Sequence, residues 1–263
     1  MATPDFAAIP EGAFRMGADD GPHPEDGEGP VREVHLSAYR IATTTVTNAL
    51  FAAFAEATGY VTTAETRGHS QVFAGQLRDA DDHPPASPVT PWWRQVAGAC
   101  WRRPDGEKAA RESLPVVHVS LPDALAFCAW TGTRLPSEAE WERAAQDQRG
   151  IEPHIWQGFF PDRPRGPVGP RPALDGAPNV HGLRHACGNV WEWTADRFAR
   201  LHSPRPVRDP KGPLSGTRFV VKGGSFLCAP SCCARFRPSS RRAEYPDATA
   251  SHLGFRIARD ARD

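Results

Sequence analysis

The sequence predicts one compact α+β domain with a high loop content and little regular secondary structure. Three observations lead to this fold class. The 27 prolines and 23 glycines are spread along all 263 residues and divide the chain into short segments. Two helices carry clear start and stop signals, and the strand-like runs are short. Because we find no internal repeat and no linker, we expect a single domain over residues 1–263, with its core at about 9–260.

The N-terminal part of the chain is expected to hold strands and one helix. Residues 10–17 end a short strand-like piece in tight turns, and residues 32–47 are rich in β-branched residues, which predicts a strand. A helix should begin after Thr47 or Asn48, because an apolar stripe follows, and Gly59 should end it. Residues 61–113 are expected to be mostly irregular.

The second half begins with a short predicted strand at residues 115–119. Ser120 is the expected cap of the helix that follows, and Gly132 ends that helix. Residues 150–182 are dominated by proline, glycine and arginine and should form a loop. Short late strands are expected within residues 220–228, 232–238 and 252–259.

A second helix is predicted in RLPSEAEWERAA, where Ser137 and Glu140 have the spacing of a capping box. Glu138 and Glu142 add two further carboxylates to this helix. Helix capping and a solvated helix face explain these acidic residues more simply than a catalytic carboxylate pair.

Composition excludes several classes of function. The 31 basic and 31 acidic residues balance, so no net field attracts nucleic acid or an acidic membrane surface. The chain has no basic segment followed by an apolar run at its start and no stretch of about 18 apolar residues, so we expect a cytoplasmic protein with no membrane partner. It also lacks the phosphate-binding loop, the H-E-x-x-H zinc motif and the G-x-S-x-G elbow. A monomer is the default expectation.

Half of the six cysteines lie in one segment, GGSFLCAPSCCARFR. Cys228 and Cys233 have a C-x4-C spacing, and no second pair exists to complete a zinc site. Two thiolates suit Cu(I), a soft ion, but a reversible disulfide and three small buried side chains fit the spacing as well. In a strand, Cys232 and Cys233 would point to opposite faces and would not serve one site.

The segment ACGNVWEWTADR is a second candidate site. Asn189 and Glu192 offer oxygen ligands of the kind that calcium prefers, together with backbone carbonyls of the turn. The pattern alone favours the alternative, an aromatic-rich turn packed into the core.

The order of several motifs along the chain resembles the formylglycine-generating enzymes, also called sulfatase-modifying factors. The resemblance covers about residues 9–260, and these segments carry it: IPEGAFRMG, TNALFAAFAEATGY, PVVHVS, RLPSEAEWERAA, GNVWEWTAD, DPKGPLSG, VVKGGSFLC and ASHLGFRIARD. The C-x4-C pair behind GGSFL is the most specific mark, because the iron enzymes of the same superfamily do not carry it.

The resemblance implies a fold related to C-type lectins and an oxidase that uses Cu(I) and O2. Its substrate would be a cysteine in the C-x-P-x-R motif of a sulfatase, converted to Cα-formylglycine. Cys228 and Cys233 would be the copper ligands, with Ser225 and Trp191 shaping the oxygen pocket. One calcium site would use the residues Gly188, Asn189, Val190 and Glu192. The substrate would contact Trp92, Trp93, Arg241 and His252.

Some positions depart from the family pattern. Ala229, Pro230, Cys232 and His252 differ from the residues usual at the border of the substrate groove. Cys128 is expected to be a free buried thiol. Two alternatives therefore stay open: a copper oxidase that acts on another peptide or a small-molecule thiol, and a non-catalytic binding module on the same fold.

Overall fold

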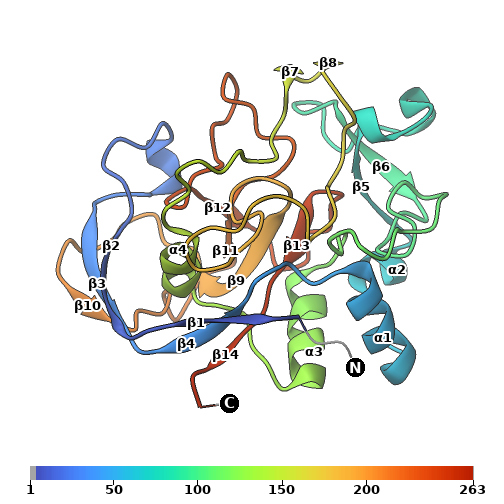
Figure 1. Ribbon diagram of the computed structural model, residues 1–263. Helices are drawn as coiled ribbons and strands as arrows, with labels where there is room; N and C mark the ends of the chain where they lie inside the picture. The colour runs from blue at the N-terminus through green and yellow to red at the C-terminus, as the bar shows by residue number, and fades with distance from the viewer. Residues whose placement is uncertain (1–3, 263) are drawn as a thin grey trace.

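The centre of the molecule is a four-stranded sheet with the order β12–β11–β9–β13 (Figure 1). These strands span Arg241–Glu244, Phe219–Lys222, Trp191–Arg197 and Leu253–Phe255. Strand β9 pairs antiparallel with β11 and parallel with β13. The computed structural model describes residues 4–262 of the chain.

Smaller sheets surround this centre. One has the order β1 (Phe6–Ile9), β4 (Tyr39–Ala42) and β14 (Ala258–Asp260), so both ends of the chain meet in it. A second has the order β10 (Val207–Arg208), β3 (Arg32–Leu36) and β2 (Gly12–Met16). Two hairpins complete the strands: β5 (His69–Phe73) with β6 (Trp93–Ala97), and β7 (Gly158–Phe159) with β8 (Arg163–Pro164).

The helices are short and begin at capping side chains. They are α1 (Asn48–Thr58), α2 (Thr63–Arg67), α3 (Leu121–Thr131) and α4 (Glu138–Ala145), with 3-10 turns η1 (Pro24–Asp26), η2 (Ala74–Gln76) and η3 (Ala80–Asp82). The predicted caps are confirmed, since Thr47, Ser120 and Ser137 each accept a backbone N–H of the first turn. Gly59 and Gly132 end their helices in the left-handed conformation, as predicted. Within residues 4–262, every helix is too short or too polar to cross a lipid bilayer.

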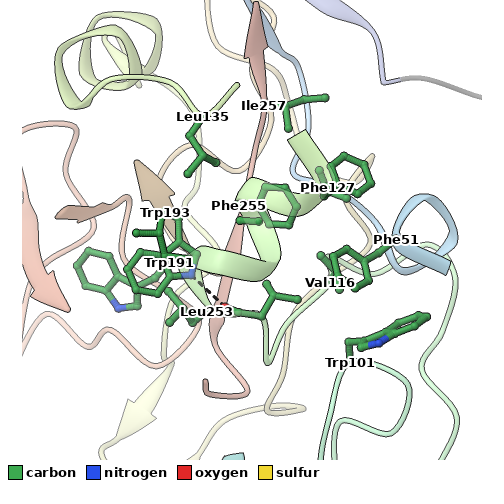
Figure 2. Close-up of a cluster of buried hydrophobic side chains, with 14 of the residues drawn as sticks. Phe51, Trp101, Val116, Phe127, Leu135, Trp191, Trp193, Leu253, Phe255 and Ile257 are labelled. Atoms are coloured by element: carbon green, nitrogen blue, oxygen red, sulfur yellow. Dashed lines mark hydrogen bonds between the residues drawn. The ribbon is translucent and has the colours of Figure 1, made fainter. Parts of the chain in front are cut away.

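Aromatic side chains join helices α1 and α3 to the central sheet (Figure 2). Phe127 of α3 lies 5.9 Å from Phe51 of α1 and 5.4 Å from Phe255 of β13, measured between ring centroids. Each such pair adds about 0.5–1.5 kcal/mol beyond the area it buries. This packing fixes β13, and with it the start of β9, because Leu253 pairs with Trp191.

A fully buried ion pair crosses the centre of the fold. Arg256 donates two hydrogen bonds to the Glu192 carboxylate, of 2.5 and 2.7 Å, and Trp141 donates a third of 2.7 Å. The same guanidinium donates to the carbonyls of Ala42 and Arg184. Glu192 and Arg256 therefore connect the central sheet to strand β4, helix α4 and the loop before β9.

Two predicted strands differ in the structure. Residues 32–47 form two strands in different sheets, because the backbone N–H and hydroxyl of Ser37 bind the Asp209 carboxylate and turn the chain. Residues 115–119 form no strand; only Pro115 makes an isolated bridge, to Thr47. His118 interrupts this segment with a φ of 61°.

Three further segments differ from expectation. Residues 61–113, expected to be irregular, contain α2 and the hairpin β5–β6. Residues 191–197, expected as part of a turn, form the central strand β9. Residues 232–238 form turns rather than a strand, because three consecutive backbone N–H groups point at one carbonyl, that of Ala229.

The acidic residues of helix α4 also differ from expectation. Glu138 and Glu142 are buried rather than solvated: Glu138 binds Arg241, and Glu142 accepts a 2.9 Å bond from the buried ammonium of Lys222. Glu140 caps the helix as predicted and also binds Arg134. Helix α4 therefore directs two carboxylates inward to pair with cations of the central sheet.

The Glu192–Arg256 pair predicts a large stability effect. Glu192→Gln leaves the Arg256 guanidinium buried without its counterion, which should lower the free energy of unfolding by about 3–5 kcal/mol. Chemical denaturation measures this change. Asp81→Asn is the control, because Asp81 pairs with Arg94 through a side chain that is 100% exposed. Equal stability of the two variants would contradict the central role of the pair.

Candidate active site

The site begins where strand β11 ends, at a glycine pair. Gly223 and Gly224 have φ values of 89° and 73°, a region that side chains disfavour. A Cβ on Gly224 would lie 2.2 Å from the carbonyl oxygen of Arg235. The two glycines therefore allow the chain to turn directly against residues 235–236, which follow Cys233.

The cysteines lie on two successive turns. The N–H of Cys228 donates to the Ser225 carbonyl, and the N–H of Ser225 approaches the Cys228 sulfur at 3.4 Å. The Ala229 carbonyl then accepts the N–H groups of Cys232, Cys233 and Ala234 at 3.0–3.1 Å. These turns bring Cys233 back to Cys228 and leave Cys232 exposed at the surface. Cys232 is thus separated from the pair, although the reason is a turn and not the strand that we expected.

The paired thiols share one proton. All six cysteines are free, and the Cys228 and Cys233 thiols interact strongly enough to shift each other's pKa in opposite directions. Donation from Cys228 lowers the pKa of Cys233 to about 6, whereas the same bond, together with burial, raises the pKa of Cys228 well above its ordinary value. At neutral pH the metal-free pair therefore holds one thiolate and one thiol, close together and reduced.

Ser225 contacts Cys228, and Trp191 shares a buried apolar cluster with Cys228. Ser225 is fully buried, and its hydroxyl accepts the N–H of Leu227 at 3.3 Å, which holds the turn closed. Trp191, at the start of β9, belongs to the large buried apolar cluster that also contains Cys228. The structure therefore places Ser225 directly against Cys228, and Trp191 in the same core.

An aromatic cluster adjoins the cysteine turn. Trp92 and Trp93 belong to it, and the His252 ring packs on Trp93 with centroids 4.6 Å apart. It also contains Phe73, Trp156, Phe160, Phe226, Leu227 and Ala229. We call this cluster the aromatic wall. It brings three of the four predicted substrate residues to the side of the cysteines.

Trp156 was missed by the sequence reasoning, although the aromatic density of HIWQGFF was a signal for it. Its N–H donates to the Cys228 carbonyl at 3.1 Å, which joins the wall to the turn. Its indole nitrogen, like Nδ1 of His252, is buried without a hydrogen-bond partner in the described part of the chain. Burial also lowers the pKa of His252 well below its ordinary value, so its ring is neutral. Both polar atoms are closed off from solvent, so a ligand would reach them only after neighbouring side chains move.

Arg241 is a correction to the predicted substrate set. Its guanidinium is buried and donates to both oxygens of Glu138, at 2.6 and 2.9 Å, and to the carbonyls of Asp26, Gly27 and Ala199. These bonds occupy its donors away from the aromatic wall. The residue holds the fold together and does not face a substrate.

An acidic loop before β3 holds the cysteine segment and was also missed. His23 contacts the Cys233 carbonyl through Nε2 at 2.5 Å. Asp26 pairs with Arg235, and Glu28 accepts bonds from Arg237 and Ser239 at 2.6 and 2.9 Å. No local motif marks these contacts, because they join residues about 210 positions apart.

The residues of the predicted calcium site do not fit that ion. The Glu192 carboxylate is occupied by Arg256 and Trp141. The Asn189 side chain binds the backbone of Arg171 through both its oxygen and its nitrogen. Only the carbonyls of Gly188 and Val190 would remain, and residues 4–262 hold no cluster of three or more His, Cys, Asp or Glu side chains suited to a metal ion. We correct this expectation.

The cysteine pair does fit a soft monovalent metal. Cys228 and Cys233 offer two sulfur donors, one buried and one half-buried, and the lowered pKa of Cys233 favours its thiolate. Soft thiolates prefer Cu(I), which accepts low coordination numbers, and a bound cation would replace the shared proton.

Comparisons with known proteins agree along the whole chain. A family model described as "Sulfatase-modifying factor enzyme 1-like domain" matches residues 1–261. The formylglycine-generating enzyme of Thermomonospora curvata is 46% identical, over 97% of this chain and 93% of that protein. The enzyme of the same name from Streptomyces coelicolor is 43% identical, over 96% and 88%. The solved structure of PvdO from Pseudomonas aeruginosa has a TM-score of 0.71 at 22% identity, covering 98% of this chain and 94% of PvdO, and so shares the fold.

The shared proton predicts the reactivity of Cys233 in metal-free protein. In a Cys232→Ser background, alkylation of Cys233 by iodoacetamide should rise with pH around a midpoint of about 6, because the thiolate forms above its lowered pKa. Cys228→Ala removes the donor and should move the midpoint up toward about 8.5. Peptide mass spectrometry of the Cys233 fragment measures both rates. A midpoint that is the same in both proteins would contradict the pairing.

Proposed function

The chain belongs to the formylglycine-generating enzyme family, and from this premise we propose that it is a Cu(I)- and O2-dependent oxidoreductase. Its reaction is the conversion of a substrate cysteine to Cα-formylglycine, with the C-x-P-x-R motif of a sulfatase as the substrate. Cys228 and Cys233 are the proposed copper ligands.

One observation carries this proposal. Cys228 and Cys233 are free and coupled to each other, with a lowered pKa at Cys233, and Ser225 and Trp156 join the Cys228 turn to a buried framework. Preorganised sulfur donors bind a soft ion without the cost of gathering them. The family identities of 46% and 43% support cysteine oxidation as the chemistry.

The proposed metal supplies a site for electron transfer to O2 and a charge that keeps a third, substrate thiol deprotonated. The overall reaction is balanced by an added reductant. The substrate CH2–SH group becomes an aldehyde and releases sulfide, which removes two electrons. O2 accepts four electrons, ending as the aldehyde oxygen and one water, so an external thiol has to supply the other two.

The protein residues bind and orient the substrate. The aromatic wall offers apolar faces beside the cysteine turn, which suit the apolar parts of an extended peptide. Ser225 holds the Cys228 turn through backbone contacts, and the buried Trp191 limits water at the pair. His252 stays neutral and adds no charge to the groove.

The two ligands predict a loss of both metal binding and turnover. Cys228→Ser and Cys233→Ser should each lower Cu(I) affinity and the rate of aldehyde formation by about 100-fold or more, since even second-shell changes cost about 10- to 100-fold. The assay uses copper-loaded protein, a C-x-P-x-R peptide, O2 and a thiol reductant. Mass spectrometry follows loss of the thiol and gain of the aldehyde.

Cys232→Ser is the matched control, because Cys232 is the exposed neighbour of Cys233. It should keep copper affinity and turnover near those of the unaltered protein. Unchanged Cu(I) affinity in Cys228→Ser and Cys233→Ser would favour the non-catalytic binding module. Tight copper binding without any aldehyde would contradict the sulfatase substrate.

A second candidate keeps the chemistry and changes the substrate to another peptide or a small-molecule thiol. The observation that favours it is the border of the site, where Cys232 is exposed and His252 packs on Trp93. O2 consumption by the copper-loaded protein with a panel of small thiols and unrelated cysteine peptides tests it. Faster turnover of any of these than of the C-x-P-x-R peptide supports the second candidate.

A further inference from the structure

A cavity of about 320 Å³ lies away from the cysteine turn. It is bordered by strands β2 and β3, the first turn of α4 and residues 196–213, in the part of the fold where Figure 1 labels β2, β3 and β10. None of its lining residues belongs to the cysteine segment or the aromatic wall. It is therefore a separate place on the protein.

The walls of this cavity carry an excess of positive charge. Its cationic lining residues are Arg32, Arg197, Arg205, Lys211 and Arg241. Its carboxylates are Glu138 and Asp196. Five cations against two carboxylates give the lining a net positive charge, although the chain as a whole is neutral.

Both carboxylates are already occupied. Glu138 accepts two hydrogen bonds from Arg241, and Lys222 lies 3.9 Å away. The oxygens of Asp196 accept the backbone N–H groups of Glu138 and Gly212, each at 2.5 Å. Neither carboxylate lies within ion-pair distance of the cation that faces them, Arg32.

Arg32 is the unusual member of the cavity. Its side chain reaches the interior from β3 and the residue is only 8% exposed. Among the described residues, its guanidinium makes one side-chain hydrogen bond, to the Met16 sulfur at 3.4 Å, and no ion pair. Thioether sulfur is a weak acceptor, and a guanidinium remains charged in proteins. Glu138 and Glu142 attract this guanidinium only from beyond ion-pair distance, and Arg241 repels it. A largely buried guanidinium without a directly bound carboxylate is costly, so an anion in the cavity would stabilise it.

We propose that this cavity binds a tetrahedral oxyanion of the phosphate or sulfate type, with Arg32 as its main donor. The planar fork of a guanidinium matches two oxygens of such an ion, which a halide cannot offer. Arg205 and Lys211 lie at the exposed rim, where they attract the ion from solution. The cavity volume leaves room for the ion and several waters.

Isothermal titration of the full-length protein with inorganic phosphate and with sulfate tests this site, using chloride at equal ionic strength as the reference. The unaltered protein should bind one oxyanion saturably and show a rise in Tm that chloride does not give. Arg32→Met keeps the volume and removes the charge, and should weaken oxyanion binding at least about tenfold. Arg78→Gln, at a side chain that is 89% exposed, removes a charge elsewhere and should bind normally.

The rim provides a second variant should Arg32→Met not fold. Lys211→Gln should weaken binding several-fold and reduce its dependence on salt, because it removes one attracting charge. Equal responses to phosphate, sulfate and chloride in the unaltered protein would overturn the proposal. So would oxyanion affinity that is unchanged in both Arg32→Met and Lys211→Gln. Copper binding at the cysteines is measured separately and is not expected to change.

Discussion

The fold depends on one buried carboxylate–guanidinium pair, Glu192 with Arg256. Its charges are shielded from water, and their energetic cost is offset only because every oxygen and most N–H groups find partners. Those partners lie on β4, α4 and the loop before β9. The strands of this domain are short and bury little apolar surface at each contact. The Glu192–Arg256 pair therefore adds a charged link between the central sheet and its neighbouring elements. The pair also fixes the register of β9, which carries Trp191 to the cysteine site.

A second layer of buried charge extends this connection toward the cysteines. Lys222 of β11 binds Glu142, and directly after it the Gly223–Gly224 turn begins. The buried Lys222–Glu142 bond holds the end of β11 in place. Gly223 and Gly224 then adopt positive φ values, which allow the chain to reverse direction sharply. The cysteine segment therefore starts from a fixed point. Its two thiols converge because the backbone turns at the Ala229 carbonyl, and Cys233 then packs against the main apolar core.

The sequence predicted the features that depend on neighbours along the chain. Thr47, Ser120 and Ser137 cap their helices, because a cap is a contact between residues three apart. The sequence did not predict side-chain environments that depend on contacts between residues far apart in the chain. Glu138 and Glu142 were predicted to lie on a solvated helix face. They are buried instead, because Arg241 and Lys222, from distant parts of the chain, pair with them. Spacing left the role of the cysteine pair open; resemblance singled out its members, and the geometry around the Ala229 carbonyl explains how they meet.

The acidic loop at residues 23–28 shows how the two halves of the molecule depend on each other. The Asp26 side chain holds Arg235, two residues past Cys233, while its backbone carbonyl accepts a bond from Arg241. One residue thus joins the cysteine turn to the charge network of α4 and the central sheet. Because side chain and backbone act together, a shift of Arg241 has to move the loop, and a shift of the loop has to move the turn. Ionic and hydrogen-bond contacts of distant residues therefore help to set the position of Cys233. For this reason the C-x4-C motif identifies the two cysteines in the sequence but does not predict their geometry.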